Sequence, residues 1–305
     1  MKKGVLNSIK ITSLSVIGFL CMGCQSGDDP GPLPVNEQLP VETLPEDPEP
    51  EAGYKLPEID LSHWKVTLPV GSPTEVYPPE ILNYASNEVL KPFMYNDSVD
   101  GSLVFFTYPG ASTANSSYSR TELRELIDPA DLSQNWTFNE GGKMKGTLAL
   151  DEISTDKDGK FHRTIIMQIH GRLSDEQREM IGAKDNNAPP ILKIYWYKGL
   201  IRVKSKYLKD KNATDTEVLY TDAWGDDDGF NFETEVGFEP FTLEIIASSG
   251  RMEIVLNDKE SYTIENDDMK RWAVFENYFK AGNYLATKDE GSFAKVKYYS
   301  LEVKH

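Results

Sequence analysis

The sequence predicts an all-β fold, a jelly-roll sandwich of two antiparallel sheets. From Tyr54 onward, short runs of β-branched and aromatic residues alternate with clusters of Gly, Asn, Asp and Pro, a pattern typical of strands joined by turns. Amphipathic helical periodicity is weak, and the best short candidates are 78–84 and 174–182. Two sheets packed face to face are the simplest way to bury so many short strands.

The strand candidates follow one another through the whole of this region. Lys198-Gly199 and Ser249-Gly250 stand between neighbouring candidates, as tight hairpin turns do. No repeat and no linker divides the region, so we expect one domain at 54–305. The strongest candidates are 63–70, 102–108, 144–153, 163–171, 191–197, 200–207, 241–248, 251–257 and 294–303.

The composition excludes several classes of protein. The 305 residues include only two cysteines, Cys21 and Cys24, so the predicted domain contains no thiol. A disulfide scaffold, a zinc–thiolate site and a cysteine nucleophile are therefore excluded from it. With 49 acidic against 32 basic side chains the net charge is -17. This charge argues against nucleic acid as a partner, because phosphate binding requires a basic surface.

Residues 1–23 resemble a bacterial lipoprotein signal peptide. Lys2 and Lys3 precede a short apolar run, and Cys24 follows directly after it. We expect Cys24 to be lipidated and the protein to be an exported lipoprotein of the outer membrane or cell surface of a Gram-negative bacterium; the alternative is an ordinary cleaved signal and secretion. Residues 24–53 are rich in Pro and acidic residues and lack Lys and Arg, which predicts an extended tether.

Three segments carry polar side chains on one face of a predicted strand, because residues two apart share a face. In 118–126 the aligned residues are Tyr118, Arg120, Glu122 and Arg124. A row of this kind is also typical of a solvent-facing strand with paired charges.

The other two segments add a histidine and two tyrosines. In 163–171 the predicted apolar face consists of Ile165, Met167 and Ile169, and the opposite face carries Gln168 and His170. In 278–284 the aligned residues are Tyr278, Lys280, Gly282 and Tyr284. Gly282 lacks a side chain in the middle of its face, which would let a ligand approach the backbone closely.

Together these faces offer donors that can bind a carboxylate and groups that can move a proton. A basic hairpin face at Arg202, Lys204 and Lys206 would extend the set. The histidines show no metal-binding spacing, so we expect neither a metal nor a cofactor. They are His63, His162, His170 and His305.

Three motifs on these faces resemble the signature blocks of the alginate lyases of polysaccharide lyase family 7. They are SRTELRE at 119–125, QIH at 168–170 and YFKAGNY at 278–284, and the run HWKVTLPVG resembles the first strand of that family. The resemblance implies a jelly roll with a concave substrate-binding sheet and an anionic polysaccharide, alginate, as substrate. It implies catalytic roles for Arg120, Gln168, His170 and Tyr284. The substrate-binding candidates are Lys280, Arg124, Glu122, Tyr278 and Lys204.

Two positions bear on specificity. Ala286 stands where the family usually has a glutamine, which affects a binding contact rather than the chemistry. Ile169 stands where other members have Val, and Ile accompanies action on guluronate-containing blocks in the family. By strand parity Ile169 points away from the substrate-binding face.

The implied reaction is β-elimination at a 4-linked uronate, which leaves 4,5-unsaturated uronate ends. Arg120 and Gln168 would neutralise the uronate carboxylate while the C5 proton is removed. For guluronate, His170 would act as base and Tyr284 as acid. For mannuronate, Tyr284 could perform both steps with His170 orienting it.

Other functions are compatible with the same residues. A lyase of this fold acting on another polyuronate, such as glucuronan, would share the mechanism. A non-catalytic surface polysaccharide-binding module would need no proton-transfer pair. A glycoside hydrolase would need two facing carboxylates, whereas Glu122 is the only acid on these faces. We expect a monomer.

Overall fold

The structure is a computed structural model that describes residues 56–305. The predicted signal peptide, Cys24 and the tether at 24–53 lie outside the described residues. All described residues belong to one compact unit, Pro50–His305. In the described part of the chain, no helix has both the length and the apolar character needed to span a membrane.

The regular secondary structure of residues 56–305 is mostly β. The strands are β1 (Glu58–Ile59), β2 (Trp64–Thr67), β3 (Glu75–Val76), β4 (Met94–Asn96), β5 (Leu103–Thr107), β6 (Arg120–Glu125), β7 (Trp136–Thr137), β8 (Gly142–Ile153), β9 (Arg163–Arg172), β10 (Asn187–Tyr197), β11 (Leu200–Leu208), β12 (Trp224–Asp226), β13 (Phe230–Glu235), β14 (Phe241–Ser248), β15 (Arg251–Leu256), β16 (Glu260–Glu265), β17 (Glu276–Leu285) and β18 (Ala294–Lys304). The helices are α1 (Asp175–Ile181), α2 (Asp267–Arg271) and the short 3-10 turns η1 (Glu80–Asn83), η2 (Glu217–Leu219), η3 (Thr221–Ala223) and η4 (Trp272–Val274).

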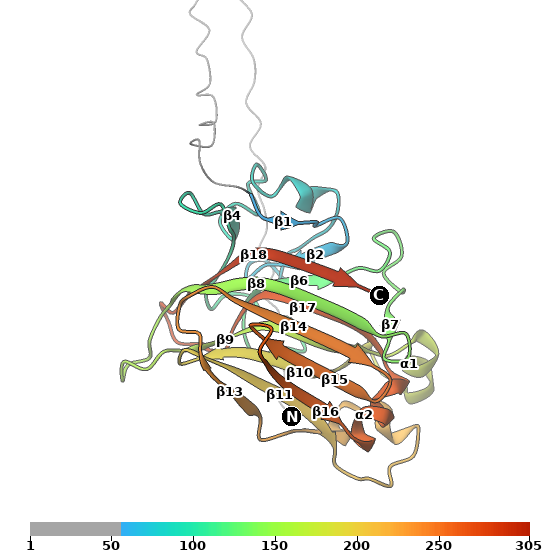
Figure 1. Cartoon of the computed structure of the whole chain (residues 1–305). Helices are drawn as coiled ribbons and strands as arrows, with labels where there is room; N and C mark the ends of the chain where they lie inside the picture. The colour runs from blue at the N-terminus through green and yellow to red at the C-terminus, as the bar shows by residue number, and fades with distance from the viewer. Residues whose placement is uncertain (1–55) are drawn as a thin grey trace, which may run out of the picture. The chain divides into compact units, whose positions relative to one another are not determined.

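The strands form two sheets, which lie as two layers in Figure 1. Within the described residues one sheet has eight strands, in the order β16-β15-β14-β8-β18-β5-β4 with β1 beside β18. The other has ten strands, in the order β12-β11-β10-β9-β17-β6-β2-β3, with β13 beside β11 and β7 beside β17. This is the predicted jelly-roll sandwich of two antiparallel sheets; among the described strands, only β1 pairs in parallel, with β18.

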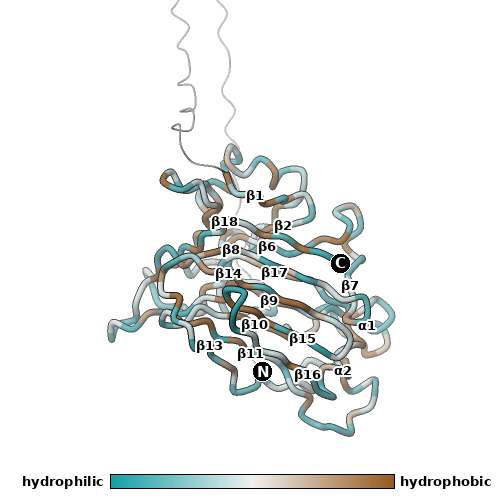
Figure 2. The backbone as a smooth tube through the Cα atoms, in the orientation of Figure 1, coloured by the Kyte–Doolittle hydropathy of each residue, from teal (hydrophilic) through white to brown (hydrophobic). Residues whose placement is uncertain are grey.

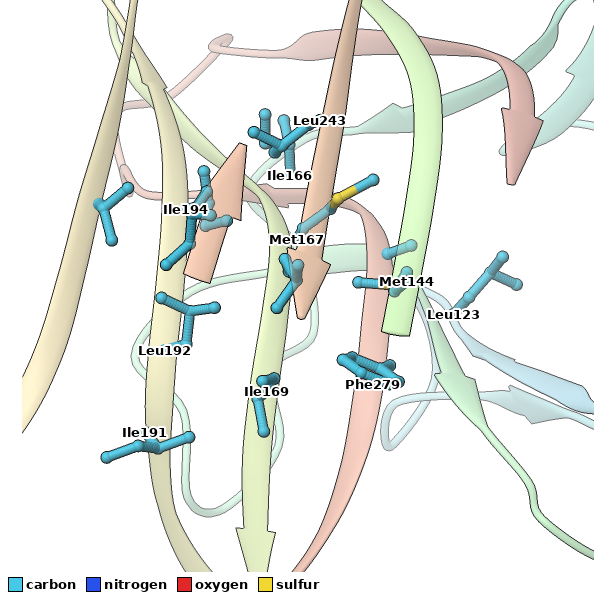
Figure 3. Packing of buried hydrophobic residues seen from close by; sticks show 14 of the residues in the cluster. Leu123, Met144, Ile166, Met167, Ile169, Ile191, Leu192, Ile194, Leu243 and Phe279 are labelled. Atoms are coloured by element: carbon cyan, nitrogen blue, oxygen red, sulfur yellow. The ribbon is translucent and has the colours of Figure 1, made fainter. Parts of the chain in front are cut away.

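The hydrophobic core lies between the two sheets. It joins Leu123, Ile169 and Phe279 of the ten-stranded sheet to residues such as Met144 and Leu243 of the eight-stranded sheet (Figure 3). Hydrophobic residues concentrate along the strands of both sheets, while many of the loops are hydrophilic (Figure 2). The outer face of the ten-stranded sheet is therefore free to carry polar side chains.

Most predicted elements are confirmed. Each predicted strand matches an observed one, and the hairpin turn at Lys198-Gly199 has positive φ at both residues, 55° and 82°, as a tight I′-type turn requires. The helix predicted at 174–182 is α1, where the Ser174 side chain accepts from the Gln177 backbone and the Gln177 side chain accepts from the Ser174 backbone. The candidate at 78–84 is the 3-10 turn η1.

Strand β9 breaks the predicted alternation. Met167 pairs with Ile194 of β10, but the next pair is Ile165 with Tyr195, so Ile166 is an extra residue in a β-bulge. Ile166, Met167 and Ile169 all lie in the core (Figure 3). The prediction that Ile165 shares their face is wrong, because the bulge turns Ile165 to the outer face of the sheet.

Candidate active site

Three neighbouring strands bring the predicted site residues together. Strand β17 lies between β9 and β6, and the two outer strands are each antiparallel to it. Cα partners in such a ladder share a face, and the relevant pairs are Tyr278 with His170, Lys280 with Gln168 and with Arg124, and Tyr284 with Arg120. We call this outer side of β9, β17 and β6 the polar face.

Glu122 joins three polar side chains of the polar face. Its side chain is only 1% exposed, and it accepts hydrogen bonds from the amide of Gln168 and from the guanidinium of Arg120, at 3.2 Å from Nη1. It also forms an ion pair with the ammonium group of Lys280. A buried carboxylate with three such donors orients them rather than binding substrate itself.

Arg120 connects Glu122 to Tyr284. Its guanidinium lies over the Tyr284 ring, 4.0 Å from the centroid, and the Tyr118 ring meets the Tyr284 ring edge-on at 6.3 Å. The Nε atom of Arg120 is buried and has no hydrogen-bond partner among residues 56–305. An unpaired buried donor is costly, and this N–H is unsatisfied among the described residues.

His170 is held by Tyr278 and by the backbone. Its ring stacks on the Tyr278 ring with centroids 5.3 Å apart, and its Nδ1 atom lies 2.9 Å from the Gly171 carbonyl oxygen and 3.1 Å from the Tyr278 hydroxyl. Because a carbonyl can only accept, the hydrogen bond to Gly171 places the proton on Nδ1 and leaves the lone pair on Nε2. This is the tautomer that a base facing a ligand would need.

Burial and nearby cations keep this histidine neutral. Burial lowers the pKa of His170 to about 3, and the charges of Lys280, Arg120 and Lys193 act in the same direction. Burial also lowers the pKa of Lys280 to about 8, with Arg120 adding to the effect and Glu122 opposing it. The polar face is therefore short of negative charge, and an anionic ligand would relieve that imbalance.

The packing of β17 on β6 accounts for Gly282. It adopts φ +134°, and a Cβ atom there would lie 2.7 Å from the Thr121 carbonyl oxygen of β6. The glycine is thus required by close packing of β17 on β6. Close approach of a ligand need not be invoked to explain it.

Lys204 also lies on this side of the sheet, on β11, but it is engaged by the loop after β12. Its ammonium donates to the Asp227 carbonyl oxygen at 3.0 Å. Lys206 forms an ion pair with Asp226 at 2.6 Å, and Arg202 donates to Asn231 at 2.8 Å.

Sequence reasoning missed three residues on the polar side of this sheet. Lys193 and Tyr195 alternate with the buried Leu192, Ile194 and Trp196 along β10, so strand parity alone could have found them. Ile165 could not be found in this way, because only the bulge places it opposite Tyr195 and Tyr284.

Two loops meet across the polar face. Asn115 precedes β6 and Asp185 follows α1, and the Asn115 amide donates to the Asp185 carboxylate at 3.1 Å. Since β6 and β9 run in the same direction, these loops come from opposite ends of the polar face. The other side of the sheet packs on the core, so the hydrogen bond bridges the outer side.

A jelly-roll sandwich whose outer sheet face combines an arginine, a glutamine, a histidine and a tyrosine has the architecture of a polysaccharide lyase. A family model described as alginate lyase matches residues 59–305. The chain belongs to the alginate lyases of polysaccharide lyase family 7 and is an alginate-cleaving enzyme.

Solved structures agree with this assignment. Alginate lyase A1-II′, described as a member of polysaccharide lyase family 7, is 29% identical with a TM-score of 0.65, covering 81% of this chain and 96% of that chain. The family 7 lyase AlgAT5 is 23% identical with a TM-score of 0.60, covering 82% and 99%. Alginate lyase PA1167 from Pseudomonas aeruginosa is 22% identical with a TM-score of 0.61, covering 81% and 99%. No curated protein matches the chain.

Proposed function

We propose that the enzyme cleaves alginate by β-elimination on the polar face, with a preference for guluronate-containing blocks. The observation that carries the proposal is the separation of a neutral, backbone-fixed His170 from Tyr284 by the Arg120–Glu122–Gln168 group. In guluronate the C5 proton and O4 lie on opposite faces of the sugar ring. Their elimination therefore requires a base and an acid on opposite sides of the group that binds the carboxylate.

The first chemical need is to neutralise the uronate carboxylate. The C5 proton is a very poor acid while the carboxylate beside it is charged. Arg120 donates to Glu122 through Nη1, which leaves other N–H groups of the guanidinium for the substrate, and Gln168 retains a second amide hydrogen beyond the one given to Glu122. These donors stabilise the dianion that forms as the proton leaves, in the manner of an oxyanion hole.

The second need is a base and an acid. The Nε2 lone pair of His170 removes the C5 proton, and the hydroxyl of Tyr284 protonates the departing O4. His170 hydrogen-bonds Tyr278 rather than Tyr284. The mechanism for mannuronate would need a hydrogen bond from His170 to Tyr284, and the structure has His170 bonded to Tyr278 instead. This arrangement favours guluronate as the substrate.

Two solved structures of one relative, A1-II′, support these roles. A1-II′ with a substituted tyrosine is described in complex with product (GGG), and A1-II′ with a histidine and a tyrosine substituted is described in complex with substrate (GGMG). These proteins are 29% and 28% identical to this chain. A histidine–tyrosine pair whose substitution leaves a substrate bound is consistent with proton transfer by His170 and Tyr284.

The test is ultraviolet absorbance of the enzyme incubated separately with polyguluronate, polymannuronate and glucuronan, with a chelator present. A rise on polyguluronate, from the new C4–C5 double bond, is expected. A rise only on glucuronan would change the substrate and keep the mechanism. No rise on any polymer, from a folded protein, would favour a binding module.

Two substitutions assign the proton-transfer roles. Tyr284→Phe and His170→Asn are each expected to lower the rate by roughly 10²- to 10⁴-fold. Tyr220→Phe and His63→Asn are matched controls, since Tyr220 is 43% exposed and both lie away from the polar face. Full activity in Tyr284→Phe or His170→Asn would remove that residue from the mechanism.

We also infer that the enzyme acts as a monomer anchored by acyl chains on Cys24. The support is the signal-like segment at 1–23 and the acidic, proline-rich segment that follows it. Size-exclusion chromatography with light scattering tests the oligomeric state.

A further inference from the structure

A row of aligned positions crosses the ten-stranded sheet from β11 to β2. Cα partners connect Lys204, Lys193, Gln168, Lys280, Arg124 and Lys65 in this order. Partners share a face of the sheet, so five of the six positions present a cation on the outer side. At the usual strand spacing the row extends over about 24 Å. A polyanion lying along it would meet a positive charge at nearly every strand.

Four of these five cations already have partners. Lys280 pairs with Glu122, and Lys65 pairs with Glu75 at 2.7 Å. Arg124 donates to the side chain of Asn135 at 2.9 Å, and Lys204 donates to the Asp227 carbonyl oxygen at 3.0 Å. Lys193 makes no hydrogen bond and no ion pair within residues 56–305, although its side chain is half-buried.

The surroundings of Lys193 are mostly cationic. Lys204 and Lys206 of β11 and Arg163 of β9 lie near it, and Asp226 is the acid that opposes them. Asp226 is itself paired with Lys206 at 2.6 Å. Burial lowers the pKa of Lys193, and the neighbouring cations add to this effect. An anion placed here would compensate charge that the protein leaves unbalanced.

We propose that Lys193 binds the carboxylate of a uronate residue next to the one that reacts between His170 and Tyr284. Lys193 lies one strand from Gln168, about 4.8 Å away across the sheet, and each residue of a polyuronate carries one carboxylate. The inference rests on the proposed function, because it assigns a second contact of the same substrate chain.

The position of Lys193 determines which kinetic constant it affects. The neighbouring uronate does not change charge in the reaction, so its contact with Lys193 is equally strong in the ground state and the transition state. Such uniform binding lowers KM and leaves kcat unchanged.

The experiment compares Lys193→Gln with Lys198→Gln in the full chain, with polyguluronate as substrate. Lys198 lies in the exposed turn of the same β10–β11 hairpin, so its substitution makes the same charge change away from the polar face. Lys193→Gln is expected to raise KM about tenfold, as loss of one charge-assisted hydrogen bond would, with kcat within about twofold. Lys193→Arg, which keeps the charge, should stay close to the wild-type KM.

Ionic strength gives a second readout. Salt screens exposed charge interactions, so the wild-type KM should rise with added NaCl. The rise should be smaller for Lys193→Gln, which has already lost the contact, and unaltered for Lys198→Gln.

Three results would overturn the proposal: an unchanged KM in Lys193→Gln, an equal rise in Lys198→Gln, or a fall in kcat at constant KM. Failure of the proposed function would look different, because the wild-type enzyme would then give no unsaturated product on any polyuronate. In that case calorimetric binding of polyguluronate to the wild type, Lys193→Gln and Lys198→Gln still tests the subsite.

Discussion

At the scale of single residues, the cations around His170 predict an unusual pH dependence. Burial and the charges of Lys280, Arg120 and Lys193 lower the pKa of His170 to about 3 in the free enzyme. The proposed base is therefore neutral throughout the range from pH 4 to 7. A bound carboxylate compensates the same cations, so the pKa of His170 rises in the enzyme–substrate complex.

The expected result follows from which species each kinetic constant reports. Because kcat/KM reports the free enzyme and kcat reports the complex, kcat should fall at a higher pH than kcat/KM when the solution is acidified. Initial rates on polyguluronate from pH 4 to 7, with stability monitored in parallel, should show a flat kcat/KM and a kcat that falls towards the acid end of the range. If kcat and kcat/KM both fell at the same pH, near the ordinary pKa of histidine, the lowered pKa of His170 would be contradicted.

At alkaline pH, we expect deprotonation of Lys280 to lower kcat/KM. Burial lowers its pKa to about 8, so the free enzyme loses a positive charge from the polar face above that pH and binds an anionic polymer less well. We expect kcat/KM to fall above about pH 8. Lys280→Arg should abolish this fall, since a guanidinium does not deprotonate in proteins. An unchanged alkaline limb in Lys280→Arg would assign it to another group.

The sequence was informative about single residues wherever strand parity held. Arg120, Glu122, Gln168, His170, Lys280 and Tyr284 all lie on one face, as predicted. Parity alone could not show that Glu122 binds three donors at once, because those contacts join three strands far apart in the chain. The same reason explains why Lys193 was overlooked, since its neighbours Gln168 and Lys204 come from other strands.

At the scale of elements, a buried tyrosine of the opposite sheet fixes the irregular pairing of β9 with β17. Tyr298 of β18 is fully buried; its hydroxyl donates to the Ile166 carbonyl oxygen at 2.6 Å and accepts from the Gly282 backbone at 3.1 Å. Ile166 and Gly282 stand where the pairing shifts between Ala281 and Tyr284. The hydroxyl thus satisfies backbone groups that the irregular ladder would leave unpaired.

The shift sets the position of Tyr284 relative to β9, so Tyr298→Phe is expected to displace the proposed acid, Tyr284, without removing it. Loss of both hydrogen bonds should lower stability by about 1–3 kcal/mol. A displacement of Tyr284 should lower kcat roughly ten- to a hundredfold, with little change in KM. Tyr299→Phe is the matched control, because the Tyr299 hydroxyl contacts Asp100 instead, at 3.2 Å. Normal kcat in Tyr298→Phe, measured well below its melting temperature, would separate this hydroxyl from catalysis.

Regular strands could be predicted and irregular ones could not. Runs such as 241–248 and 251–257 alternate in hydrophobicity and form β14 and β15 as expected. The bulge at Ile166 depends on contacts with β10 and β18, which no local pattern encodes. Short edge strands such as β12 and β3 are held mainly by pairing with a longer neighbour, so their own two or three residues carry little signal.

At the scale of the whole molecule, the acidic chain must meet an anionic polymer despite its net charge of -17. The cations of the polar face supply the local attraction, so the place where the enzyme is held matters more than its overall charge. Lipidation of Cys24, as proposed, would hold the enzyme at a membrane through residues 25–53, which are rich in proline and acidic side chains.

The two cysteines of the leader allow this anchoring to be tested with a matched pair. Cys24→Ala removes the predicted acylation site, whereas Cys21→Ala removes a thiol three residues earlier within the segment predicted to be cleaved off. Membrane fractionation of cells expressing each variant should find Cys21→Ala with the membranes and Cys24→Ala lost from them. Specific activity should be equal in both, because the predicted catalytic residues all lie beyond residue 119. Equal fractionation of the two variants would instead favour an ordinary cleaved signal and a secreted enzyme, since acyl chains on Cys24 are the only anchor that the sequence predicts.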